Sequence, residues 1–220
     1  LGEYVDNRLH FYKINEIEVP SVTGDVVPEY VKSTEDYKDN IIGKYSRDLE
    51  KLHIDKYVLY KEWVNSRGIV LRFDRKAVEI RVIDEQECVK SDVAIGCFVR
   101  AAMRGLMEIH DKDNQLLPHG LLVEDFNSMM KDGLRTRVLH PMGPTAHDVC
   151  KYFYKLATEN SSDEEKSYLP LIKKRIEGGS LSESIARDVK KKSQRTEMRE
   201  AILETYLNIA RSLKDNTPYF

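Results

Sequence analysis

The 220-residue sequence lacks long apolar runs, and it lacks an excess of charge of either sign. No run approaches the roughly 20 apolar residues that a membrane-spanning helix requires, which argues against a membrane protein. The formal net charge is −2, so no global basic field indicates a nucleic-acid partner. Apolar residues still make up 41% of the chain, which is enough for a buried core.

Cysteine is also scarce, and the three cysteines, Cys88, Cys97 and Cys150, are not spaced like metal ligands. We therefore expect free thiols in a cytoplasmic protein, each acting as a small buried residue rather than as a nucleophile. None of the six histidines stands four residues from another or in a His-x-His pair, which argues against a zinc site.

Glycine-rich nucleotide motifs are absent as well. The chain has no Gly-x-x-x-x-Gly-Lys-Ser/Thr, Gly-x-Gly-x-x-Gly or Gly-x-Ser-x-Gly, which argues against P-loop, Rossmann and hydrolase-elbow sites. One basic run, Lys190–Arg195, is either a solvated helix end or a polyanion site. No signal peptide is visible, and the start at Leu1 without methionine suggests a processed product, a tag remnant or a cut piece.

The most strand-like stretch is Ile69–Asp84, with a bend expected at Asp74–Lys76. Strand side chains alternate between the two faces of a sheet, so Glu79 and Arg81 share a face, roughly 6–7 Å apart. A carboxylate and a guanidinium fixed on a strand can bind a metal ion and a phosphate or carboxylate, respectively. The alternative is an ion pair on a solvated sheet face, and spacing alone leaves both interpretations open.

Outside this stretch, periodicity predicts short strands within residues 1–28 and helices over most of the rest, while Tyr57–Trp63 stays undecided between strand and helix. A sheet-bearing segment, 1–115, and a helical segment, 116–220, would form one α+β domain. The small residues of the helix from Val93 predict close packing on a sheet. The predicted helices follow Ser33 to about Leu52 and cover Val93–His110, Val123–Met130 (ended by Gly133), Thr145–Ala157, Glu164–Glu177, Ser180 or Ser182 to Asp188, and Glu197–Leu213. The last helix would turn an apolar face, Ile202, Leu203, Tyr206, Ile209, Ala210 and Leu213, to a core or a partner.

An ordered set of segments resembles the glutamate–cysteine ligase and carboxylate–amine ligase superfamily. The central one is its Glu-x-Arg strand, here Ala77–Asp84, followed by a polar loop and a small-residue helix. Glu-x-Arg alone is unspecific, so the order of the segments over roughly residues 25–220 carries the resemblance. The other matching segments are Pro28–Ser33 with Tyr37, Glu124-Asp125 to Asp132-Gly133-Leu134, Tyr168-Leu169 with Arg175–Gly179, and Leu213–Tyr219.

The resemblance implies an antiparallel sheet packed with helices, related to glutamine synthetase. It implies that ATP activates a carboxylate as an acyl phosphate, which an amine then attacks to form an amide. Glu79 would bind Mg²⁺, and Arg81 would hold the substrate carboxylate or the transferred phosphate, with Arg72 and Arg75 as weaker candidates for the same anion. Amino acids and ATP would be the substrates.

Departures from the family pattern define the alternatives. Nothing here resembles the family's N-terminal half, so the chain looks like a C-terminal portion that is inactive alone and needs that half or a partner chain. Asp125, Phe126 and Ser128 stand where many members carry arginines, and Arg72–Arg75 only loosely replaces a Trp-Asp-x-Arg-Pro motif. A non-catalytic binding or oligomerisation module is the second hypothesis. Under either, a homo-oligomer is expected because a half-domain would leave a sheet edge bare.

Overall fold

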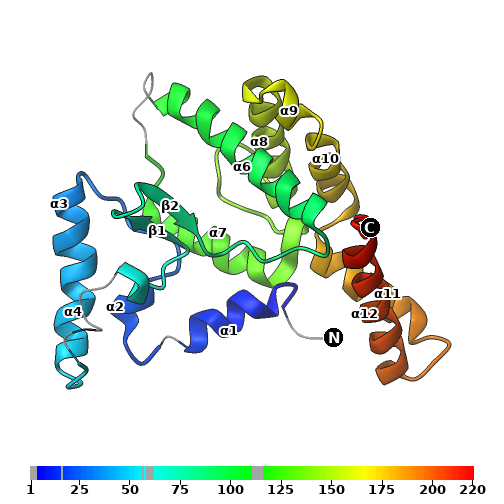
Figure 1. Cartoon of the computed structure of the whole chain (residues 1–220), viewed down its shortest axis with the longest axis horizontal. Helices are drawn as coiled ribbons and strands as arrows, with labels where there is room; N and C mark the ends of the chain where they lie inside the picture. The colour runs from blue at the N-terminus through cyan, green and yellow to red at the C-terminus, as the bar shows by residue number, and fades with distance from the viewer. Residues whose placement is uncertain (1–3, 16, 56, 58–61, 111–115) are drawn as a thin grey trace. The chain divides into compact units, whose positions relative to one another are not determined.

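The computed structural model describes residues 4–15, 17–55, 57, 62–110 and 116–220 (Figure 1). Its internal contacts divide the chain into two compact units, which we call the hairpin unit and the helical unit. The hairpin unit comprises Asp6–Asp84 and Leu117–Asn127, and the helical unit comprises Leu1–Val5, Glu85–Leu116 and Ser128–Phe220. That segments 1–115 and 116–220 belong to one domain stays a prediction.

The hairpin unit begins with helices rather than with the short strands expected within residues 1–28. That prediction was wrong because the Asp6 carboxylate accepts from the Leu9 N–H at 2.9 Å and starts a helix, while Pro20 occupies the first turn of a second one. The elements of the unit are α1 (Asn7–Asn15), α2 (Pro20–Thr23), α3 (Thr34–Tyr37), η1 (Lys38–Ile42), α4 (Gly43–Glu50), η2 (Glu62–Val64), β1 (Ile69–Arg72) and β2 (Ala77–Ile80).

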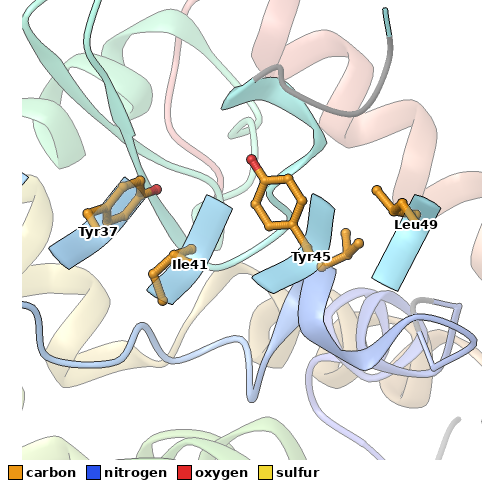
Figure 2. Close-up of a cluster of buried hydrophobic side chains, with 5 residues drawn as sticks. Tyr37, Ile41, Tyr45 and Leu49 are labelled. Atoms are coloured by element: carbon orange, nitrogen blue, oxygen red, sulfur yellow. The ribbon is translucent and has the colours of Figure 1, made fainter. Parts of the chain in front are cut away.

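The helix predicted after Ser33 is confirmed as the continuous run α3–η1–α4. The Ser33 hydroxyl accepts from the Asp36 N–H at 3.1 Å, which satisfies one of the free donors of the first turn. Four apolar side chains then recur every fourth residue along the run and bury one face against Val22. Figure 2 shows the four as sticks: Tyr37, Ile41, Tyr45 and Leu49.

The predicted hairpin is also confirmed. Strands β1 and β2 pair antiparallel, with Val70 opposite Glu79 and Arg72 opposite Ala77, and the chain bends over residues 73–76 as expected. Lys76 completes the bend in the left-handed region, at φ +49°. Within the described residues these two strands form the only sheet, so the fold is α+β with helices predominating.

The helical unit is built from long helices whose ends follow the predicted caps. Thr145 accepts from the Asp148 N–H, and Gly133 follows α7 at φ +64°. No helix in the described ranges is long and apolar enough to cross a bilayer. The helices are α6 (Val89–His110), α7 (His119–Asp132, shared with the hairpin unit), η3 (Gly133–Arg135), α8 (Ala146–Asn160), α9 (Asp163–Lys166), α10 (Leu169–Gly178), α11 (Leu181–Lys192) and α12 (Met198–Asp215).

Small residues let α6 approach its neighbours closely, as its composition predicts, but the neighbours are helices α8 and α10. Ala101 and Ala102 of α6 meet Ala157 of α8 in a buried cluster. A Cβ added at Gly105 would lie 2.6 Å from the Leu156 side chain, so any larger residue would force Leu156 to shift. The expectation of packing on a sheet was therefore wrong about the partner of α6.

The last helix, α12, decides between the two expectations for its apolar face, because that face does not meet a core within the described residues. Its buried side chains are Ala201 and Thr205, which lie on the side facing α11. Most of the apolar face predicted to meet a core or a partner is open to solvent: Ile202, Leu203, Tyr206, Ala210 and Leu213 are exposed, and Ile209 is half-buried.

Candidate functional site

The hairpin brings three of the four predicted site residues together on one face. Glu79 lies directly opposite Val70, and direct cross-strand partners point to the same side of a sheet. Arg72 follows Val70 by two residues on β1, and Arg81 follows Glu79 by two residues just beyond β2. The strand period therefore aligns the three charged side chains, with Glu79 between the two arginines.

Each arginine holds a different oxygen of the Glu79 carboxylate. Arg72 Nε donates to Glu79 Oε2 at 2.5 Å, and Arg81 Nε donates to Oε1 at 2.8 Å. The ion pair considered from the sequence is thus present, but it is a triad rather than a pair. Arg75 does not join it: its exposed side chain makes no ion pair with the described part of the chain.

Burial within the triad is uneven. The side chains of Arg72 and Arg81 are 17% and 19% exposed, whereas that of Glu79 is 37% exposed. Hydrogen bonds from Arg72 and then Arg81 lower the pKa of Glu79 to about 2, and the same contact raises the pKa of Arg72. The triad itself, two guanidinium groups and one carboxylate, carries one net positive charge at neutral pH, and guanidinium groups are the side chains that bind carboxylates and phosphates.

Two backbone carbonyls hold Arg81 in place. The backbone N–H of Arg81 donates to the Gly68 carbonyl at 2.8 Å, and its guanidinium donates to the carbonyl of Asn65. The Asn65 side chain is buried and donates to the Tyr37 hydroxyl at 2.7 Å. Asn65 thus supports the site, and no sequence pattern indicated this role because its partners lie on other elements.

A second carboxylate lies near the triad. Glu62 on η2 accepts from the Phe73 N–H at 3.1 and 3.2 Å, and its charge contributes to the raised pKa of Arg72. Sequence reasoning missed Glu62 because it left residues 57–63 undecided between strand and helix. Residues 58–61 of that stretch lie outside the described residues.

The loop leading into β1 is fixed by a bidentate ion pair between a buried arginine and a partly exposed glutamate. Arg67 is 1% exposed and donates to the two Glu29 oxygens at 2.5 and 2.7 Å. Burial opposes ionisation of Glu29, but the hydrogen bond and charge of Arg67 outweigh it and lower the pKa of Glu29. This bidentate pair positions residues 65–68 and hence the carbonyls that accept from Arg81.

The triad fits an anion better than it fits a magnesium ion. Both Glu79 oxygens already accept from guanidinium groups, and Mg²⁺ would have to displace them. Among the described residues, no group of three or more histidine, cysteine, aspartate or glutamate side chains could hold a metal ion. The residues present therefore do not build a magnesium site by themselves.

Together, these features define an α+β protein with a glutamate flanked by two arginines on a β-hairpin. The chain belongs to glutamate-cysteine ligase family 2, whose profile matches residues 2–208. It is also similar to an uncharacterized protein of Archaeoglobus fulgidus, with 40% identity over 216 residues that cover 98% of this chain and 53% of that protein. The chain thus spans about half the length of this relative. No solved structure matches it.

Proposed function

We propose that the chain is the C-terminal portion of an ATP-dependent carboxylate–amine ligase, most similar to glutamate–cysteine ligase. The Arg72–Glu79–Arg81 triad is the observation that carries the proposal, because it presents two fixed guanidinium groups and one net positive charge at a partly open face. Membership of glutamate-cysteine ligase family 2 supports the proposed reaction class. Amino acids and ATP are the proposed substrates.

In this reaction a substrate carboxylate oxygen attacks the γ-phosphorus of ATP and ADP leaves. The amine nitrogen then attacks the acyl carbon, phosphate leaves, and the amine gives up a proton. Arg81, assisted by Arg72, would hold the carboxylate or the phosphoryl oxygens, because guanidinium groups bind such oxygens with two parallel hydrogen bonds. Glu79 would keep both guanidinium groups aligned until the anion arrives.

Magnesium and a complementary half belong to the proposal as well. In the family resemblance Glu79 is a Mg²⁺ ligand, a role that would require carboxylates from outside the described residues and release of the two arginines. We therefore propose that a further half, in the same polypeptide or on a partner chain, completes the site. The chain alone should then bind anions without turning over ATP.

The test is ATP turnover with glutamate and cysteine in the complete natural polypeptide. We expect Arg81→Ala to lower kcat/KM by about 100-fold or more, as loss of a transition-state donor does. Arg100→Ala is the matched control, because Arg100 also flanks a glutamate, Glu165, but lies on α6 in the helical unit. An unchanged rate in Arg81→Ala would refute the assignment of Arg81.

A non-catalytic binding module is the second candidate. It is favoured by one observation: both oxygens of Glu79 are paired within the chain, as in a structural ion-pair cluster. Under this hypothesis, Arg81→Ala would lower the stability of the hairpin unit but would leave turnover of the complete polypeptide unaffected.

A further inference from the structure

Helix α12 carries an apolar stripe with the spacing of a coiled-coil seam. Leu203, Tyr206, Ala210 and Leu213 follow one another at intervals of three, four and three residues, which is the a/d pattern of a heptad repeat. All four are exposed, and the fractions are 61% for Leu203, 56% for Tyr206 and 57% for Leu213. An aligned stripe of this kind differs from the single apolar residues scattered over ordinary surfaces.

The stripe points away from the helix that α12 packs against. At about 100° per residue, the buried Ala201 and Thr205 lie on the opposite side of α12 from Leu203 and Ala210. Contacts join α12 to α11, its neighbour in Figure 1, and Lys192 of α11 donates to the Thr205 hydroxyl on that buried side. The α11–α12 pair thus leaves its second apolar face without a partner in the described part of the chain.

We propose that this stripe is the interface between two copies of the chain, paired antiparallel about a two-fold axis. In that register Leu203 lies opposite Leu213 of the second copy, and Tyr206 lies opposite Ala210 of the second copy. Large residues therefore meet small ones in the central layers, as helix packing requires. The seam then has four layers, two outer ones that pair Leu203 with Leu213 and two central ones that pair Tyr206 with Ala210. They fit within the length of the 18-residue helix, about 27 Å, and α11 packs on the other side of each α12.

Two charged residues beside the stripe favour a second copy of the chain as its partner, in the antiparallel orientation. Glu200 near the start of α12 and Lys214 near its end flank the same edge of the stripe, and both are exposed. Neither takes part in an ion pair within the described ranges. Antiparallel pairing brings the same edges of the two stripes together and places Glu200 of each copy against Lys214 of the other, whereas parallel pairing puts these edges on opposite sides of the seam and forms no such pair.

Sedimentation equilibrium of the 220-residue chain over a range of concentrations tests the interface. We expect a reversible dimer, and we expect Leu203→Glu to weaken dimerisation at least tenfold because it puts a charge into each outer layer. Leu139→Glu is the matched control, since Leu139 has the same 61% exposure but lies outside α12, and it should leave the dimer intact. A chain that is monomeric at every concentration, or a dimer that tolerates Leu203→Glu, overturns the proposal; circular dichroism checks that the variants fold.

A charge swap tests the orientation. Glu200→Lys and Lys214→Glu should each weaken the dimer about threefold, because each replaces two favourable pairs by two repulsive ones. The double variant should recover wild-type affinity, and so should an equimolar mixture of the two single variants, in which opposite charges meet again. Failure of both recoveries would rule out antiparallel pairing of α12.

Discussion

The molecule uses the same charge arrangement twice, with opposite burial. In the hairpin unit Glu79 lies between Arg72 and Arg81, and in the helical unit Glu165 lies between Arg100 and Arg104. In each case both carboxylate oxygens accept from guanidinium groups, and the pKa of the carboxyl falls to about 2.

The two clusters differ in which of their side chains is buried. Around Glu165 the carboxylate is 2% exposed while Arg100 is 68% exposed; around Glu79 the carboxylate is the most exposed member. The buried carboxylate also accepts from the Ser162 N–H at 2.8 Å as part of a capping box that starts α9. Glu165 therefore ties α6 to the start of α9, whereas the Glu79 carboxylate joins two positions of one hairpin and stays partly open to solvent.

The largest expected difference between the clusters is in stability. Glu165→Ala removes a helix cap and two charge-assisted hydrogen bonds, so we expect Tm to fall by about 5 °C or more. Glu79→Ala should lower Tm by no more than about 2 °C, because its partly exposed ion pairs contribute little. Thermal unfolding of both variants by calorimetry measures the contrast, and equal losses would contradict it.

Substitutions in the hairpin cluster should affect anion binding more than substitutions in the Glu165 cluster, which is the opposite of their effects on Tm. Arg81→Lys keeps the charge but loses the planar, two-pronged donor, so we expect the affinity of the chain for inorganic phosphate to fall about tenfold. Arg100→Lys is the control and should leave phosphate binding unchanged. Isothermal titration gives both affinities, and the assignment of the hairpin site fails if the two variants behave alike.

Removing the hairpin carboxylate should strengthen anion binding. Glu79→Gln raises the net charge of the cluster by one, and we expect phosphate affinity to rise about threefold at low ionic strength, with a smaller gain as salt screens the charges. Glu165→Gln, which changes the net charge of the other cluster equally, should have no such effect. A loss of affinity in Glu79→Gln would mean that alignment of the arginines outweighs their added charge.

The smallest expected effect concerns titration. The pKa of Glu79 is lowered from 4.5 to about 2, so its contribution to stability is complete above pH 4.5 and is lost as the pH falls towards 2. Glu165 has the same window. Sulfate bound at the hairpin should raise the pKa of Glu79 by about half a pH unit and leave Glu165 unchanged, because a nearby anion disfavours a second negative charge. Carboxyl carbon NMR during an acid titration detects the difference.

The sequence by itself determined the features that depend on neighbouring residues. Ser33 and Thr145 cap their helices because a hydroxyl reaches an N–H three residues on. Glu79 and Arg81 share a face because strands have a period of two. The hairpin, the helix end at Gly133, and the α+β class follow from the same short-range rules.

Only the tertiary structure decided which faces are covered. Apolar spacing is the same whether a helix face meets a core or solvent, so the exposure of Leu203 and Tyr206 could not be predicted. Glu165 is buried through arginines that lie 65 and 61 residues earlier in the chain, and Asn65 supports Arg81 across elements that are joined by no local pattern. Burial depends on contacts between distant residues, and it is burial that distinguishes a structural carboxylate, Glu165, from a carboxylate in a candidate site, Glu79.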